Sequence, residues 1–257
     1  MKLCAAQLEC KVGAIDENLE AHVHLIKLAI ANEASMIVFP ELSISGYCRE
    51  KASNLAFSPS DTRLTALQEL AVLGDITVIA GAPIRIEDRL FIGSFILHSS
   101  GAIDVYTKQY LHTGEELFYD SSMDYNPKLR IDSETIAFAI CADIDNPQHP
   151  ADASCAACSV YVPSIFFSAE GIDKGCEKLS HYANEHSMCV LMSNYSGSHW
   201  GVEAGGQSGF WTPDGNLVNA LDKGSNGLVL AYKNEGRWSV ELIETKKDRS
   251  EHLRISP

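Results

Sequence analysis

The chain has 257 residues, 46% of them apolar, and no linker-like tract rich in Pro, Gly or Ser, so we expect one large α/β domain over residues 1–257. Its formal net charge of −14 leaves too few cations for a surface that binds nucleic acid or an anionic membrane. The basic residues are scattered except for Lys246 and Lys247, which we interpret as part of a solvated face.

No stretch of the sequence approaches the roughly 18 consecutive apolar residues of a membrane span. The first residues, MKLCAAQLECK, carry polar side chains too early for the apolar core of a signal peptide. We therefore expect a cytoplasmic protein whose eight cysteines are reduced thiols. These cysteines are Cys4, Cys10, Cys48, Cys141, Cys155, Cys158, Cys176 and Cys189.

The first half of the chain alternates between strand-like and helix-like patterns. Apolar residues three or four positions apart predict a helix over residues 18–34. A second helix is expected after Asp61, which suits an N-cap, and should end before Gly74. A turn at residues 99–101 is typical of a hairpin. The predicted strands span residues 3–8, 36–39, 76–80, 91–98, 105–106 and 135–140.

The second half begins with helices and strands in alternation and ends in β-structure. The predicted helices span residues 151–158 and 173–186, the strands between them residues 161–162 and 189–192, and two hairpins residues 210–221 and 227–243. Each half thus supplies helix–strand units and a hairpin. This pattern predicts two packed sheets with helices outside, a four-layer α-β-β-α sandwich.

Three polar side chains each follow a predicted strand. Glu41 comes just after residues 36–39, Lys108 just after residues 105–106, and Cys141 directly after residues 135–140. A carboxylate, an ammonium and a thiol are the groups that acyl transfer through a thioester requires. The sequence therefore predicts an active site at the ends of these strands.

Several motifs around these residues resemble the nitrilase superfamily, the carbon–nitrogen hydrolases. The resemblance runs the length of the chain and keeps the order of the motifs. It implies an α-β-β-α fold, hydrolysis of a non-peptide C–N bond without cofactor or metal, and a homodimer or larger homo-oligomer. The motifs are PELSISGY at 40–47, KQYL at 108–111, CAD at 141–143, SNYSG at 193–197 and GGQSGFWTPDG at 205–215.

The roles of the three residues follow from their chemistry. A thiol with a pKa of about 8.5 is only a few per cent thiolate at neutral pH, so Cys141 needs a base to act as nucleophile. Glu41 is the expected base, because an apolar setting should raise its pKa. Lys108 and the backbone N–H of Ala142 are expected to stabilise the tetrahedral oxyanion.

The resemblance also implies a second glutamate shortly after the lysine. Glu115 and Glu116 both qualify, and we favour Glu115 as a catalytic residue because of its spacing to Tyr119. Asp143 is expected to hold the loop by hydrogen bonds. The expected substrate contacts are Ala142, Glu116 and Phe166.

The pattern leaves alternative activities open. Ala142 stands where many family amidases carry Tyr or Trp, and the aromatic-plus-Glu context of nitrile hydrolysis is missing, which favours an amide or ureide substrate. The same triad permits acyl transfer to an amine or nitrile hydrolysis. A non-catalytic subunit that keeps the fold is a further alternative.

Two other constellations compete for a functional role. A rival zinc site would use Cys155, Cys158, Cys176 and His181, but the spacing of its last two ligands does not fit the usual zinc motifs. His22 and His24 fall on different faces of a predicted helix, and we interpret them as surface histidines.

The charge pattern around Cys141 bears on the substrate. No Lys or Arg occurs between Arg130 and Lys174, whereas a carboxylate-bearing substrate needs a cation near the reacting carbon. A neutral or amine-bearing amide or carbamoyl compound is therefore the expected small-molecule substrate. A cation could still come from Arg49, Lys51 or a partner subunit.

Overall fold

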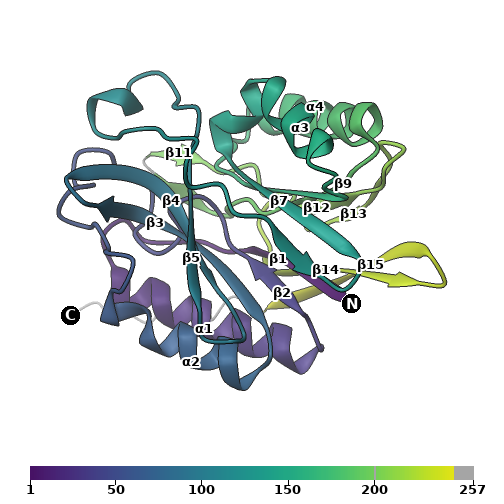
Figure 1. The fold of residues 1–257 in the computed structure, drawn as a ribbon, viewed down its shortest axis with the longest axis horizontal. Helices are drawn as coiled ribbons and strands as arrows, with labels where there is room; N and C mark the ends of the chain where they lie inside the picture. The colour runs from purple at the N-terminus through teal and green to yellow at the C-terminus, as the bar shows by residue number, and fades with distance from the viewer. Residues whose placement is uncertain (200, 246–257) are drawn as a thin grey trace, which may run out of the picture.

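Two β-sheets pack face to face in the computed structural model, and a pair of helices covers the outer face of each (Figure 1). The structure describes residues 1–199 and 201–245, so Lys246 and Lys247 lie outside the described residues. The predicted α-β-β-α sandwich is confirmed. The helices are α1 (Ile15–Ala31) and α2 (Thr65–Leu73) on one side, and α3 (Gln148–Cys155) and α4 (Ile172–His186) on the other.

The first sheet has seven strands in the order β15-β14-β1-β2-β3-β4-β5. Strands β1, β2 and β3 are parallel to one another, and the remaining neighbours pair antiparallel. Their bounds are β1 (Lys2–Gln7), β2 (Met36–Val38), β3 (Thr77–Ile86), β4 (Arg89–Leu97), β5 (Ile103–Thr107), β14 (Asn226–Asn234) and β15 (Arg237–Thr245).

The second sheet has six strands in the order β13-β12-β9-β8-β7-β6, with a parallel centre formed by β7, β8 and β9. Two short strands, β10 and β11, pair with each other outside both sheets. The bounds are β6 (Leu129–Ile131), β7 (Glu134–Ile140), β8 (Val160–Ser164), β9 (Cys189–Met192), β10 (Ser198–His199), β11 (Val202–Glu203), β12 (Gly209–Trp211) and β13 (Leu217–Ala220).

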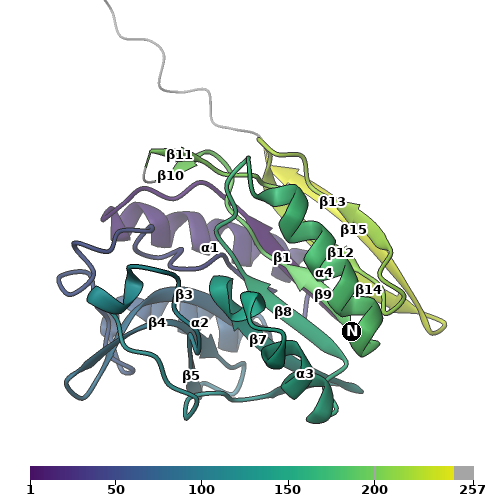
Figure 2. The same ribbon diagram turned by 90° about the horizontal axis from the view of Figure 1, so that it is seen from above.

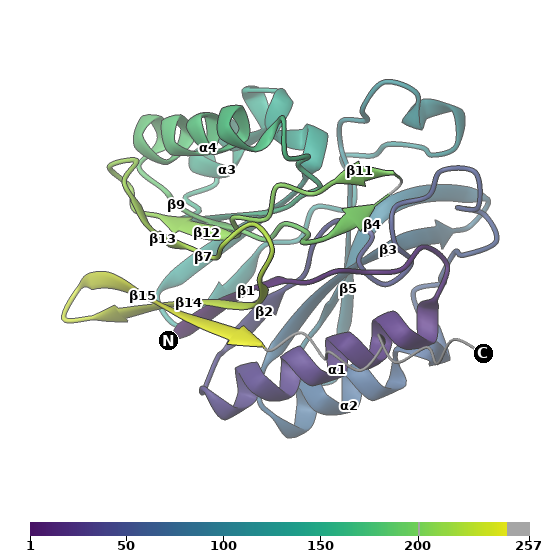
Figure 3. The same ribbon diagram turned by 180° about the vertical axis from the view of Figure 1, so that it is seen from behind.

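Apolar side chains fill the space between the layers. The cluster between the sheets joins Leu3 and Val38 of the first sheet to Phe138 and Leu191 of the second. Separate clusters lie under each pair of helices. Figures 2 and 3 show the same layers from above and from behind. Because each sheet is buried on both faces, its central strands are apolar throughout rather than alternating.

The sequence predictions match most of these elements, with ends shifted by a few residues. α1 begins at Ile15 rather than at residue 18, and the short strands β6, β10 and β11 were not predicted. Asp61 caps its helical segment as expected, since its side chain accepts a hydrogen bond from the N–H of Arg63. Within the described ranges, no helix combines the length and apolar character that a membrane crossing needs.

His22 is buried, and our interpretation of it as a surface residue was wrong. It follows Asn18 by one helical turn and shares the buried stripe of α1. Its Nδ1 lies 2.6 Å from the Asn18 carbonyl oxygen and its Nε2 2.9 Å from Ser43 Oγ. Its ring centroid is 4.1 Å from that of Phe39. His24 is exposed, as predicted.

The burial of His22 should make stability depend on pH. Burial lowers its pKa from 6.5 to about 4, so between these values the unfolded chain binds a proton that the folded protein does not. Its contribution to the free energy of unfolding is therefore present above pH 6.5 and lost as the pH falls toward 4, by about 3 kcal/mol in all. Urea unfolding at several pH values measures it.

The His22→Asn variant should show a weaker fall in stability over this pH window than the wild type. His24→Asn, two residues along the same helix but exposed, is the matched control and should keep the wild-type slope. Equal slopes in all three proteins would contradict the prediction.

Candidate active site

The ammonium of Lys108 is fully buried between two carboxylates. It lies just past the end of β5, and its Nζ donates to Glu41 Oε1 at 2.7 Å and to Glu115 Oε2 at 2.8 Å. Burial alone would lower the pKa of Lys108, but the nearby carboxylates of Glu41 and Glu115 outweigh this effect and raise the pKa. Lys108 is therefore held as a cation.

Glu41 is fully buried in the turn that follows β2. Its backbone carbonyl accepts a hydrogen bond from the Tyr195 hydroxyl, which fixes the turn. Within the described residues its Oε2 has no hydrogen-bond partner of normal geometry. Burial raises the pKa of Glu41, while the charge of Lys108 and the thiol of Cys141 act in the opposite direction. The balance of these effects raises the pKa of Glu41 above its ordinary value, which suits a group that accepts and returns protons.

Cys141 directly follows β7 and opens a 3-10 turn over residues Cys141–Asp145. Its backbone has a φ of 43°, in the left-handed region that side chains other than glycine rarely adopt. Such strain at a strand end is typical of functional sites, where it turns a side chain out of the sheet. Burial raises the pKa of the thiol, and the backbone N–H of Phe166 partly offsets this effect. The Cys141 side chain is therefore a neutral thiol at rest.

Asp143 connects the Cys141 turn to the Lys108 strand. Its Oδ1 accepts from the backbone N–H groups of Gln109 and Tyr110, both at 2.9 Å. Its Oδ2 accepts from the Ile140 N–H at 2.8 Å and from the Tyr106 hydroxyl at 2.7 Å. The expectation that Asp143 holds the loop by hydrogen bonds is confirmed.

Glu115 lies in the buried first position of a 3-10 turn over residues Glu115–Leu117. Besides Lys108, its carboxylate accepts from the Tyr47 hydroxyl at 2.8 Å and from the His112 N–H at 2.8 Å. Tyr47 was not assigned a role from the sequence, although it belongs to the PELSISGY motif. Its hydroxyl also accepts from Arg49 Nε at 2.9 Å.

A small cavity of about 170 Å³ joins these groups. Phe166 and Val202 supply apolar surface, and the polar lining includes both carboxylates and the thiol. The centroid of the Phe166 ring lies 5.6 Å from that of the Tyr47 ring. Phe166 also packs edge to face with Tyr195. The lining residues are Glu41, Tyr47, Arg49, His112, Glu115, Cys141, Phe166 and Val202.

Of the expected substrate contacts, Glu116 lies outside the cavity. Glu116 is exposed, and its carboxylate accepts from the backbone N–H of Gly114 at 2.6 Å, so the turn directs it away from the cavity that Glu115 lines. The Ala142 side chain is buried beside the nucleophile and borders a separate surface groove. Phe166 lines the cavity, as expected.

The rival zinc constellation does not form. Cys155 is exposed and Cys158 is buried. Among the residues that the structure describes, no three His, Cys, Asp or Glu side chains gather in a way that could hold a metal ion.

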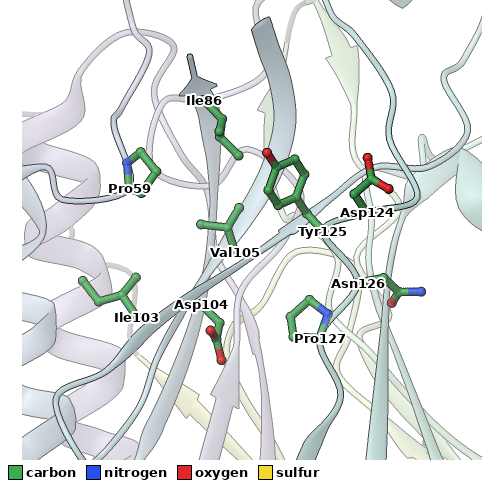
Figure 4. A pocket seen from close by; sticks show the side chains of 9 residues that line it. All are labelled: Pro59, Ile86, Ile103, Asp104, Val105, Asp124, Tyr125, Asn126 and Pro127. Atoms are coloured by element: carbon green, nitrogen blue, oxygen red, sulfur yellow. The ribbon is translucent and has the colours of Figure 1, made fainter.

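A larger groove of about 450 Å³ lies along the edge strand β5 (Figure 4). Its lining contains no cysteine, histidine or cation, and its carboxylates are Asp104 and Asp124. Tyr125 and Val105 give it a mainly apolar wall. It lacks the groups that acyl transfer needs, so chemistry rather than size identifies the candidate site.

A comparison with protein-family models matches residues 2–234 to the carbon–nitrogen hydrolase family. The chain belongs to the carbon–nitrogen hydrolase family. This result confirms the nitrilase-superfamily assignment made from the three strand-end motifs, and it makes the chain a carbon–nitrogen hydrolase enzyme.

Solved structures share the fold of this carbon–nitrogen hydrolase. The NitN amidase from Nesterenkonia sp. AN1 is 18% identical, with a TM-score of 0.82 and coverage of 91% of this chain and 93% of that one. A mutant of that amidase in complex with butyramide is 17% identical, with a TM-score of 0.81 and coverage of 90% and 89%.

Curated relatives are longer than this chain. The glutamine-dependent NAD(+) synthetases of Mycobacterium bovis and Mycobacterium tuberculosis are both 22% identical over 285 residues. The match covers 99% of this chain but only 40% of each synthetase. The chain thus spans well under half the length of these relatives.

Replacing Asp143 should destabilise the protein. Asp143→Ala would remove the acceptor of four donors, three of them buried and one partly buried, at an expected cost of about 3 kcal/mol or more in the free energy of unfolding. Asp145→Ala, in the same turn but exposed, is the matched control and should have little effect. Urea unfolding measures both, and similar losses in the two variants would contradict the assigned role.

Proposed function

We propose that this carbon–nitrogen hydrolase cleaves a small amide through a thioester, with Cys141 as nucleophile, Glu41 as general acid and base, and Lys108 as oxyanion stabiliser. The observation that carries the proposal is the buried Lys108 ammonium, bonded to Glu41 and Glu115 beside the cavity that Cys141 lines. The butyramide complex of a mutant amidase with the same fold supports an amide as the substrate class.

The first step is attack on the amide carbonyl. Because burial keeps the thiol protonated, its proton must leave as the C–S bond forms. Glu41 Oε2, which has no other partner among the described residues, takes that proton. The negative charge that develops on the carbonyl oxygen is stabilised by the Lys108 ammonium and by the backbone N–H of Ala142.

The tetrahedral intermediate then collapses. The C–N bond breaks as Glu41 returns the proton to the leaving nitrogen, which departs as ammonia or an amine and leaves a thioester on Cys141. Water attacks the thioester while Glu41 accepts one of its protons. The C–S bond breaks, the carboxylic acid is released, and the proton on Glu41 restores the thiol.

Glu115 acts on the lysine rather than on the substrate in this proposal. It neutralises and orients Lys108, and its own orientation is set by Tyr47 and by the N–H of His112. The small size of the cavity favours a short acyl group, since pockets for drug-sized ligands measure roughly 300–1,000 Å³. A homodimer or larger homo-oligomer stays a prediction, which light scattering would test.

Removing the nucleophile should abolish hydrolysis. Cys141→Ala is expected to lower kcat for butyramide by roughly 10⁴-fold or more, because no other group on the site can carry the acyl chain. The control Cys155→Ala, which removes an exposed cysteine outside the cavity, should keep wild-type kcat. Ammonia release measures both, and residual turnover near wild type in Cys141→Ala would exclude the thioester mechanism.

Glu41 should control the acidic side of the pH profile. Since the base must be ionised, kcat/KM should fall as the pH drops through the pKa of Glu41, which burial raises above 4.5. Glu41→Gln should lower kcat by roughly 10²–10⁴-fold and remove this acidic limb. A Glu41→Gln variant that keeps both its rate and its acidic limb would take Glu41 out of the mechanism.

A further inference from the structure

Arg49 brings a positive charge to the cavity that holds the candidate catalytic residues. It lies in the segment after the Glu41 turn, and it lines the same cavity as Cys141. The chain has no Lys or Arg between residues 130 and 174, and this absence favoured a neutral or amine-bearing substrate. Arg49 supplies a cation to the cavity from a different part of the chain.

Neighbouring groups hold the Arg49 guanidinium in a defined orientation. Its Nε donates to the Tyr47 hydroxyl at 2.9 Å, and its Nη1 donates to the Thr113 carbonyl oxygen at 3.3 Å. Its central carbon lies 5.5 Å from the centroid of the Tyr47 ring. The side chain is only partly buried, so the cation stands at the border between the cavity and solvent.

A short relay of hydrogen bonds fixes the position of this cation relative to the reacting groups. Lys108 Nζ lies 3.0 Å from Glu115 Oε1, and the Tyr47 hydroxyl donates to that same oxygen at 2.8 Å. Arg49 bonds the other side of the same hydroxyl. Three hydrogen bonds therefore connect the Arg49 guanidinium to the Lys108 ammonium, along the wall of the cavity that Cys141 also lines.

The charges in the cavity make this cation significant. Lys108 is one positive charge between two carboxyl groups, so an anionic substrate would meet net repulsion from these three groups alone. A guanidinium lining the same cavity offsets that repulsion and matches a carboxylate in shape, because its N–H groups can bind both carboxylate oxygens. Phe166 and Val202 provide apolar surface for the carbon chain in between.

We propose that Arg49 binds a carboxylate on the substrate, so that the enzyme acts on the monoamide of a short dicarboxylic acid in preference to neutral or amine-bearing amides. The inference rests on the proposed amide hydrolysis at Cys141. It replaces the neutral or amine-bearing substrate favoured by the sequence, and it makes Arg49 a specificity-determining residue.

Three amides of similar size and different charge test the inference. They are succinamate with a carboxylate, butyramide with a methyl group and 3-aminopropionamide with an ammonium at the position away from the amide. The wild-type kcat/KM should be roughly tenfold or more higher for succinamate than for butyramide, and lowest for 3-aminopropionamide. Equal values for succinamate and butyramide, or a preference for 3-aminopropionamide, would overturn the inference.

Variants of Arg49 separate substrate recognition from a structural role. Arg49→Met should remove the preference for succinamate, mainly through KM, so that kcat/KM falls much more for succinamate than for butyramide. Arg49→Lys should keep part of the preference, because the charge remains but the bidentate geometry is lost. Lys51→Met, which removes an exposed cation outside the cavity, is the control and should keep the full preference.

An equal loss for both substrates in Arg49→Met would mean that Arg49 only positions Tyr47, and the inference would be wrong. Binding to the inactive Cys141→Ala variant, measured by calorimetry, gives a readout that does not depend on turnover. Succinamate should bind this variant more tightly than butyramide and lose that advantage when Arg49→Met is added. Failure of the proposed mechanism is recognised separately, as hydrolysis that survives Cys141→Ala.

Discussion

The buried ammonium of Lys108 is the charge around which the site is built. An ammonium with no exposure to water is strongly unfavourable unless carboxylates and hydrogen bonds replace its hydration. Glu41 and Glu115 supply both, and they come from segments that follow β2 and β5 in the chain. The folded arrangement of these segments is thus a condition for burying the charge, and the buried charge in turn holds the two carboxylates at the cavity that Cys141 lines.

The second constraint is the conformation of Cys141. Its positive φ directs the thiol into the cavity, and such a backbone persists only where surrounding bonds over-determine it. Asp143 provides these bonds, since its carboxylate binds the backbone on both sides of the site, at Ile140 and at Gln109 and Tyr110. Asp143 therefore connects the segment of Cys141 to the segment of Lys108 across the two sheets.

The sequence predicted the parts of the molecule that local patterns control. Helix periodicity and apolar runs gave the helices and the central strands, and a polar residue after a strand located Glu41, Lys108 and Cys141. The misses have a common cause. His22 is a polar residue on the buried face of α1. Glu115 and Glu116 are neighbours of the same type, and the 3-10 turn directs Glu115 into the cavity and Glu116 toward solvent. Such placements depend on tertiary contacts, which no local pattern records.

The position of Arg49 in the cavity also depends on tertiary structure, and it concerns the charge of the ligand. A count of charges near the nucleophile in the sequence described an acidic segment, and the formal net charge of −14 pointed the same way. Electrostatic interactions in a cavity are set by the groups that line it and by the low polarity of its walls, so distant surface charges are screened while lining charges are not. In the proposed mode of recognition, one guanidinium beside Tyr47 therefore has more influence on the preferred substrate charge than the excess of acidic residues over the whole chain. Within the cavity, burial raises the pKa of Glu41 and the charge of Glu115 adds to this effect, while the Lys108 ammonium opposes it.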